Sequence, residues 1–334
     1  MNILFYVTNN PQSLIGGIER ISYRLASSLS ARKNNVFFMY THKHKNYLDN
    51  LSIQGELFIS EEEILCRSNE IVAFIKDKKI NIIIVQNVLA NKDLLSVLKH
   101  ETSCRILYVL HNLPFFEKKW VNFKEHIMPS IKNFKEKKYI YQYFQTIKRK
   151  ISYKINWDKT IEADYEYRYK NCDKFVLLSY SFKDLLIKGI KVYNKDKISA
   201  IPNMLSYDDF LDCNQLPQKE NVVLIVSRMD EPQKRILKAL SIWKRIELIH
   251  EYDEWSLEIV GEGPDLESYK KYALKNMSRV KFFGNQEPKD YYKRSSIFLM
   301  TSAHEGWGIT LTEAQQFGCV PIVMNTYSAA KDII

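Results

Sequence analysis

Long apolar runs are absent from this sequence of 334 residues. Runs such as Ile82–Val85 and Val222–Val226 are far shorter than the ~18 residues that a membrane-spanning helix needs, so no transmembrane helix is predicted. Met1–Val7 lacks the basic start and long apolar segment of a signal peptide, which favours a first β-strand and a cytoplasmic location. The five cysteines contain no Cys-x-x-Cys pair, so we expect reduced, buried thiols and neither a zinc site nor a redox pair.

The chain also lacks internal repeats and low-complexity tracts, and its composition is that of a globular protein. Hydrophobic residues make up 46% and charged residues 26%, which excludes a disordered or fibrous chain. Because single hydrophobic cores stop growing at about 250–300 residues, this length favours two domains.

Positive charge is concentrated in one stretch of the chain. The formal net charge is +10, and residues 117–159 hold twelve basic residues against four acidic ones. The same stretch is rich in aromatic residues between Trp120 and Tyr153, a mixture that suits an anionic membrane surface. A solvated helical face that covers a core is the competing interpretation. Nucleic acid is not expected as a partner, because no RNP, KH or zinc-knuckle signature accompanies the charge.

Short apolar segments alternate with longer amphipathic ones, which is the pattern of βαβ units with parallel strands. The predicted strands are Asn2–Val7, Val36–Tyr40, Ile80–Val85, Arg105–Leu110, Lys174–Leu178, Lys197–Ile201, Val222–Val226, Leu257–Val260, Val280–Phe283, Ile297–Met300 and Cys319–Val323. The predicted helices are Gly17–Arg32, Glu61–Lys79, Lys234–His250, Asp265–Lys275, Pro288–Arg294 and Thr310–Phe317.

Residues 202–221 have no clear period and contain two prolines, as expected of a linker. We therefore predict an α/β fold of two Rossmann-like, doubly wound domains, 1–204 and 205–334. Such domains bind ligands outside the carboxyl ends of their strands, so two that face each other would hold a ligand in the cleft between them.

A glycine-rich turn follows the predicted strand Ile297–Met300 and opens a helix. Residues 302–313 read SAHEGWGITLTE, in which Gly306 and Gly308 let the backbone approach a ligand closely. The free N–H groups at the start of a helix suit a diphosphate. The predicted contacts with a donor diphosphate are those of Gly308, Ile309 and Thr310.

Two glutamates frame this turn. Glu313 lies one turn inside the helix, where a carboxylate can accept both hydroxyls of a ribose, and Glu305 would face a sugar. For either residue alone, an ordinary helix cap with a surface glutamate is the competing interpretation. A glutamate, a glycine-rich turn and a second glutamate after seven intervening residues resemble the signature of retaining glycosyltransferase family 4.

A second motif of that family precedes the turn. Residues 227–235, SRMDEPQKR, follow a predicted strand and resemble the family's arginine and lysine pair that neutralises the donor diphosphate. Arg228 stands in the arginine position, and the order Gln-Lys-Arg-Ile favours Lys234 over Arg235 for the lysine. Two cations in this place can offset the charge that grows on a departing nucleoside diphosphate.

Two further turns fit the resemblance in the second half of the chain. Val260–Pro264 resembles the family's Gly-x-Gly-Pro turn. A dinucleotide-binding fingerprint would require a third glycine where Leu266 stands, which argues against a dehydrogenase. Val280–Asn285 is similar to the strand and turn whose backbone faces the donor base, which makes Gly284 a predicted donor contact.

Two elements in the first half of the chain also resemble those of the family. Gly16 and Gly17 follow the first strand and resemble the family's glycine-rich loop, whose N–H groups would close over the diphosphate. A structural turn at the start of a helix is the alternative. His111 ends a predicted strand at the position of the family's active-site histidine, where we expect contact with the donor sugar rather than proton transfer.

The resemblance implies a GT-B fold, retention of the anomeric configuration and a leaving phosphate that helps to deprotonate the acceptor. No Asp-x-Asp occurs in the chain, so no metal or other cofactor is expected, and Arg228, Lys234 and helix N–H groups would replace the metal. Family members usually continue past the equivalent of Ile334 with further elements, so the second domain is expected to be incomplete.

The predicted function is transfer of a sugar from a UDP- or GDP-sugar to a glycan or lipid-linked acceptor in surface polysaccharide or glycolipid synthesis. Catalysis is assigned to Arg228, Lys234, Glu305 and His111. The basic segment predicts peripheral attachment to the inner face of the plasma membrane. The alternatives are a catalytically silent protein that binds nucleotide sugars and a nucleotide-sugar epimerase.

Overall fold

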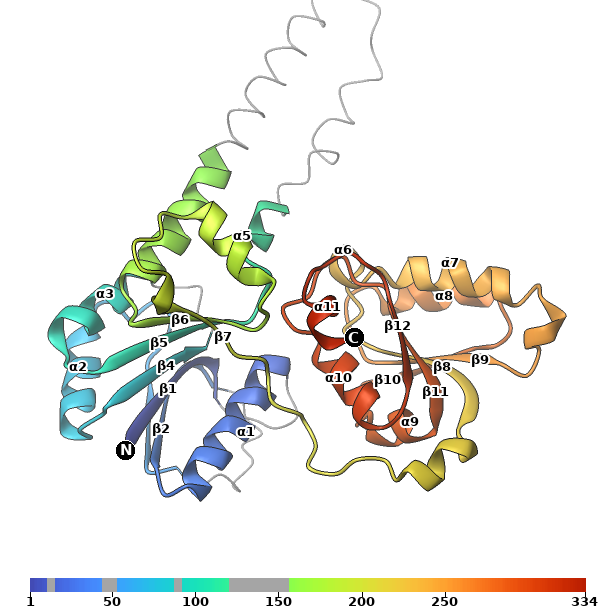
Figure 1. Ribbon diagram of the computed structural model, residues 1–334, viewed down its shortest axis with the longest axis horizontal. Helices are drawn as coiled ribbons and strands as arrows, with labels where there is room; N and C mark the ends of the chain where they lie inside the picture. The colour runs from blue at the N-terminus through green and yellow to red at the C-terminus, as the bar shows by residue number, and fades with distance from the viewer. Residues whose placement is uncertain (11–15, 44–52, 87–91, 120–155) are drawn as a thin grey trace, which may run out of the picture. The chain divides into compact units, whose positions relative to one another are not determined.

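The computed structural model describes residues 1–10, 16–43, 53–86, 92–119 and 156–334, which form two compact units (Figure 1). Unit 1 comprises Met1–Leu177 and Phe182–Ile201, and unit 2 comprises Leu178–Ser181 and Pro202–Ile334. The sequence pattern places the boundary after residue 204, close to this break, but has no signal for the assignment of Leu178–Ser181 to unit 2.

Unit 1 is built on a parallel sheet of seven strands in the order β3-β2-β1-β4-β5-β6-β7. The strands are β1 (Asn2–Asn9), β2 (Asn35–His42), β3 (Gly55–Phe58), β4 (Ile82–Gln86), β5 (Arg105–Leu110), β6 (Lys174–Leu177) and β7 (Ile198–Ala200). Its helices are α1 (Gly17–Ala31), α2 (Ser68–Asp77), α3 (Lys92–Glu101) and α5 (Phe182–Gly189), and residues 156–170 are helical too.

Both faces of this sheet are buried, which explains why its central strands are almost continuously apolar. On one face Ile3, Phe5 and Val7 of β1 pack with Ala26 of α1, and Phe5 stacks on Phe38 of β2. Alternate residues of a strand point to opposite faces. The intervening β2 residue Phe37 accordingly meets Phe74 of α2 edge to face on the other side, at a centroid distance of 6.3 Å.

Unit 2 has a parallel sheet of five strands in the order β10-β9-β8-β11-β12. The strands are β8 (Glu220–Val226), β9 (Ser256–Val260), β10 (Val280–Gly284), β11 (Ser295–Met300) and β12 (Val320–Val323). The helices are α6 (Glu231–Lys234), α7 (Ile236–Ile246), α8 (Leu266–Asn276), α9 (Lys289–Arg294), α10 (Ile309–Gln316) and α11 (Ala330–Ile333). The chain adds β9 and β10 on one side of β8 and then β11 on the other, so the strand order reverses between β8 and β11.

Helices cover both faces of the sheet of unit 2 as well (Figure 1). Val223 and Ile225 of β8 pack with Trp243 of α7 and Tyr269 of α8, all of them buried. On the other face Tyr292 of α9 meets the ring of Phe298 and stacks on Phe317 just after α10. The apolar alternation of β8 and β11 therefore anchors the two strands whose following loops carry the predicted chemistry.

A lysine fixes the end of α9 against the sheet. The Lys219 ammonium donates hydrogen bonds to the carbonyls of Tyr292, Lys293 and Ser295 at 3.0, 3.1 and 2.7 Å. The last carbonyls of a helix lack helical partners and carry partial negative charge, so a cation there satisfies both needs.

The structure corrects several boundaries. The helix predicted over Lys234–His250 begins at Ile236 and ends at Ile246 as α7. Lys234 instead ends the short helix α6, because Arg235 between the two helices adopts a left-handed conformation with φ 52°. Strand β3, helices α3, α5 and α6 and the helical residues 156–170 were not predicted. All five cysteines are free, but Cys66 and Cys213 are exposed rather than buried. Among the described residues, no helix is both long and apolar enough to cross a bilayer.

Candidate functional site

The candidate site of unit 2 lies where the loops after β8 and β11 leave the sheet. In a doubly wound sheet, loops on either side of the point where strand order reverses diverge and leave room for a ligand. A backbone hydrogen bond joins the two loops here: the Ala303 N–H donates to the Gln233 carbonyl at 2.7 Å. The Gln233 side-chain amide donates in turn to the His304 carbonyl at 3.3 Å.

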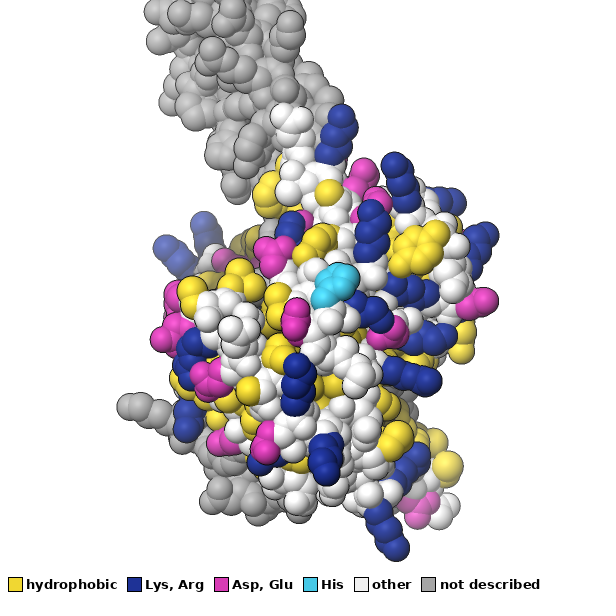
Figure 2. Space-filling view, turned by 90° about the vertical axis from the view of Figure 1, so that its left-hand side faces the viewer, with side chains coloured by type: hydrophobic (Ala, Val, Ile, Leu, Met, Phe, Trp, Pro, Cys, Tyr) yellow, Lys and Arg dark blue, Asp and Glu magenta, His cyan; other side chains and the backbone are white. Residues whose placement is uncertain are grey.

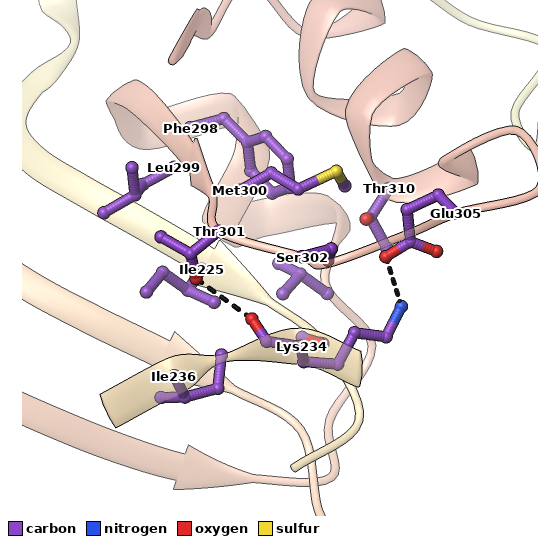
Figure 3. Close-up of a pocket in the computed structure, with 12 residues that line it drawn as sticks. Ile225, Lys234, Ile236, Phe298, Leu299, Met300, Thr301, Ser302, Glu305 and Thr310 are labelled. Carbon is purple, nitrogen blue, oxygen red and sulfur yellow. Dashed lines mark hydrogen bonds and ion pairs between the residues drawn. The ribbon is translucent and has the colours of Figure 1, made fainter. Parts of the chain in front are cut away.

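Lys234 and Glu305 meet at this junction. The Lys234 ammonium lies 2.6 Å from the Glu305 carboxylate, and the two side chains are only 18% and 9% exposed. They line one pocket together with residues of β8, α7, β11 and the start of α10 (Figure 3). Thr310 and Ser302 add hydroxyl groups to its wall. The structure thus brings three predicted site residues together: Lys234, Glu305 and Thr310.

Arg228 does not join this pair. Its guanidinium is ion-paired with Asp230 two residues later, and its side chain is 64% exposed. Of the two candidates for the lysine position, Lys234 is the one whose ammonium group reaches Glu305. The catalytic roles of Arg228, Lys234 and Glu305 remain predictions.

The Gly-x-Gly-Pro turn after β9 has a structural reason for its glycines. A Cβ atom on Gly261 would lie 1.9 Å from the Ser227 carbonyl oxygen, and one on Gly263 would lie 2.4 Å from that of Met229. The Met229 N–H also donates to the Glu262 carbonyl at 2.8 Å. These glycines therefore let the turn pack directly on the loop that carries Arg228. Gly284 ends β10 at φ 69°, beside this turn.

The start of α10 has the predicted form. Gly308 is left-handed, with φ 89°, and precedes Ile309 and Thr310 in the first turn of the helix. Glu313 is almost fully buried, with 1% exposed, and accepts a hydrogen bond of 2.8 Å from the phenol of Tyr292. Sequence reasoning missed Tyr292, because a contact between α9 and α10 leaves no short-range pattern. Ribose binding by Glu313 remains a prediction.

The remaining predicted residues lie in unit 1. Gly16 precedes α1 with φ 62°, and Gly17 is its first residue. A Cβ atom on Gly16 would lie 2.2 Å from a carboxylate oxygen of Glu19, whose other oxygen accepts a 2.5 Å hydrogen bond from Asn9. A carboxylate therefore covers the start of α1, and a diphosphate at Gly16 and Gly17 would require it to move.

His111 is buried at the end of β5. Its Nε2 lies 2.5 Å from the side-chain oxygen of Gln86, which ends the neighbouring strand β4. Burial lowers the pKa of His111 to about 4 from the usual 6.5, so the imidazole is neutral at physiological pH. Gln86 is a partner that the sequence did not suggest.

The basic segment 117–159 is described only at its two ends, and residues 120–155 lie outside the described residues. At those ends Lys118 pairs with Glu162 at 2.5 Å, and the Trp157 indole donates to the Glu117 carbonyl at 3.1 Å. On the face shown in Figure 2, Lys and Arg side chains are mixed with Asp and Glu. The predicted membrane contact thus stays a prediction.

Residues 208–334 match the family model described as glycosyl transferases group 1. The matched residues make up most of unit 2. This match covers both loops of the candidate site, with Arg228, Lys234, Glu305 and Glu313.

Curated proteins of known name also resemble the chain. The chain is 30% identical to the amylovoran biosynthesis glycosyltransferase AmsD of Erwinia amylovora over 173 residues, which are 50% of this chain and 47% of that protein. The alignment thus spans about half the length of the curated relatives that the chain matches.

Solved structures share the fold at low sequence identity. The lipopolysaccharide outer core galactosyltransferase WaaB in its apo form has a TM-score of 0.63 at 19% identity, with 100% of this chain and 83% of that chain covered. The pneumococcal O-GlcNAc transferase GtfA in complex with UDP and GlcNAc has a TM-score of 0.67 at 12% identity, with 100% and 86% covered. The predicted fold class, GT-B with two parallel-sheet domains, is confirmed.

The burial of His111 predicts a specific dependence of stability on pH. Its pKa is lower in the folded than in the unfolded chain, so as pH falls the unfolded chain takes up the proton first. Folding free energy on the order of 3 kcal/mol should be lost between pH 6.5 and about 4, and none from this group above pH 6.5. Urea unfolding at a series of pH values measures it. The variant His111→Gln should have a flatter profile in this range, and a slope equal to that of the wild type would contradict the assignment.

Proposed function

We propose that the chain is the catalytic part of a glycosyltransferase that moves a sugar from a nucleoside diphosphate sugar to an acceptor hydroxyl. The observation that carries the proposal is the Lys234–Glu305 pair, which lines one pocket with the start of α10 at the point where the strand order reverses. The group 1 family match over these residues supports it.

The proposed reaction breaks the bond between the sugar's anomeric carbon and the diphosphate oxygen, and the acceptor oxygen forms a bond to that carbon. Negative charge grows on the departing diphosphate, and Lys234 lies where it can offset that charge. Arg228, whose side chain is largely exposed, can turn from Asp230 toward the same phosphates. The acceptor oxygen bonds on the face of the sugar from which the phosphate departs, so the anomeric configuration is retained. The proton of the acceptor hydroxyl goes to the leaving phosphate.

Most of the proposed donor contacts lie in unit 2. The N–H groups of Gly308, Ile309 and Thr310 would hold the diphosphate, Glu313 the ribose, Glu305 the sugar, and the backbone at Gly284 the base. His111, Gly16 and Gly17 of unit 1 are proposed as donor contacts on the family resemblance alone. UDP is the favoured nucleotide, with GDP as the alternative, because the structurally similar GtfA is solved with UDP.

The acceptor is proposed to be a glycan or a lipid-linked glycan of a surface polysaccharide or lipopolysaccharide. The names of AmsD and WaaB, an amylovoran and a lipopolysaccharide enzyme, support this substrate class. We further propose that the protein works in the cytoplasm on the inner face of the membrane, through residues 117–159. Failure to float with anionic liposomes at low salt would count against that location.

Removal of the Lys234 charge tests the proposed function. Lys234→Met should lower kcat by about 10²–10³, the usual loss when one group that stabilises a transition-state oxyanion is removed. Lys234→Arg should retain part of the rate, and Lys238→Met, at an exposed position of α7, should leave it unchanged. Transfer is measured by mass spectrometry with UDP- and GDP-sugars and a glycolipid acceptor mixture. Wild-type kcat in Lys234→Met would remove this residue from the mechanism.

The role of Glu313 is tested by binding rather than by rate. Glu313→Gln should weaken UDP binding by about 1–3 kcal/mol in calorimetry, because the ribose hydroxyls lose a charged acceptor. Tyr292→Phe removes the neighbouring phenol but keeps the carboxylate, so it separates ribose binding from local packing. Glu267→Gln, in an exposed ion pair on α8, is the matched control. Unchanged affinity in Glu313→Gln would refute the ribose assignment.

A metal-free reaction is proposed because protein cations can supply the charge at the diphosphate. Activity should persist in EDTA at a level within about twofold of the untreated rate, since Lys234 and helix N–H groups do the work of a Lewis acid. A large loss that manganese or magnesium restores would contradict this.

A further inference from the structure

The turn that carries Lys234 is not a regular helix. Helix α6 ends at Lys234, and Arg235 follows in the left-handed region, with φ 52° and ψ 46°, before α7 begins at Ile236. A residue with a side chain is disfavoured there, so surrounding contacts must hold the turn in place. The position of the Lys234 side chain depends on those contacts.

Thr301 contacts the backbone of this turn directly. Its hydroxyl lies 3.0 Å from the Lys234 carbonyl oxygen and 3.1 Å from that of Arg235, and Thr301 itself is only 2% exposed. One hydroxyl hydrogen is shared between these two acceptors or alternates between them. Figure 3 shows the hydroxyl pointing at the Lys234 backbone from the end of β11.

Thr301 also begins the loop that carries Glu305. Thr301 is thus connected to both partners of the ion pair. It donates a hydrogen bond to the Lys234 carbonyl, and it precedes Glu305 by four positions in the chain. The backbone bond from Ala303 to Gln233 orients the two loops, but it does not act on the carbonyl of Lys234 itself.

We propose that Thr301 is a positioning residue, whose hydroxyl fixes the Lys234 turn so that the ammonium group stays at Glu305 in the pocket. The inference rests on the proposed function of Lys234 and adds a residue outside the motifs that resemble family 4. A purely structural role would lower stability without changing the behaviour of the Lys234 amine.

Three variants separate these roles. Thr301→Val has nearly the same shape and removes only the hydroxyl, whereas Thr301→Ser keeps it. Thr102→Val is the matched control, because the Thr102 hydroxyl also donates to a backbone carbonyl, that of Leu98 at 2.6 Å, but in unit 1. Thermal unfolding of all variants gives the stability effect of each substitution.

The first readout does not require activity. Each full-length variant is treated briefly with a small excess of an acylating reagent, and acylation of Lys234 is compared with that of exposed Lys238 by peptide mass spectrometry. Thr301→Val should raise the Lys234 to Lys238 ratio about fivefold, the factor by which a lost neutral hydrogen bond shifts an equilibrium. Thr301→Ser and Thr102→Val should leave the ratio at the wild-type value.

The second readout is steady-state transfer. Thr301→Val should lower kcat about tenfold with the donor KM changed less than about twofold, because the charge matters most as the diphosphate leaves. Thr301→Ser should restore most of the rate. An acylation ratio in Thr301→Val equal to that of Thr102→Val would overturn the proposal, even with a lowered melting temperature. Absence of transfer by the wild type would refute the proposed function alone, and the acylation ratio would still decide the role of Thr301.

Discussion

The parallel pairing of β8 with β11 determines where unit 2 can do chemistry. Val223 pairs with Ile297 and Leu224 with Phe298, so the carboxyl ends of both strands lie at the same edge of the sheet. The loops that follow must start side by side, although Lys234 and Glu305 are 71 residues apart in the chain. Apolar packing of the two strands against α7, α8 and α9 holds this edge in place. The ion pair is thus a consequence of the sheet.

The two cations of the site, Arg228 and Lys234, are placed differently. Gly261 and Gly263 press against the backbone of Ser227 and Met229, which leaves no room for side chains under that loop. The Arg228 side chain, on this loop, is largely exposed and meets Asp230. Lys234 lies one short helix later, where the chain turns back over the β11 loop, and its ammonium is directed inward.

Much of this arrangement follows from the sequence, and the remainder depends on contacts that no local pattern encodes. Buried parallel strands need apolar runs, so most were located to within one or two residues; β3, with alternate exposed positions and four residues, was not. The glycine-rich turn and its glutamates indicated the loop after β11. The helix break at Arg235 carries no glycine signal, and the Gln86–His111, Tyr292–Glu313 and Thr301–Lys234 contacts arise only when distant elements pack.

Each charged or acidic side chain assigned to the donor in unit 2 already has a partner: Lys234 has Glu305, Arg228 has Asp230 and Glu313 has Tyr292. Pairing lowers the free-energy cost of burying such groups. An unpaired charge as deeply buried as Lys234 or Glu305 would destabilise the fold. On the proposed function, it also sets a threshold for binding. A ligand must interact with Lys234 more strongly than the Glu305 carboxylate does, which a diphosphate can do with several charged oxygens and a neutral sugar cannot. If the Lys234 ammonium moved from Glu305 to a phosphate, the Glu305 carboxylate would be free to face the sugar. Binding of the diphosphate and release of Glu305 would then be coupled.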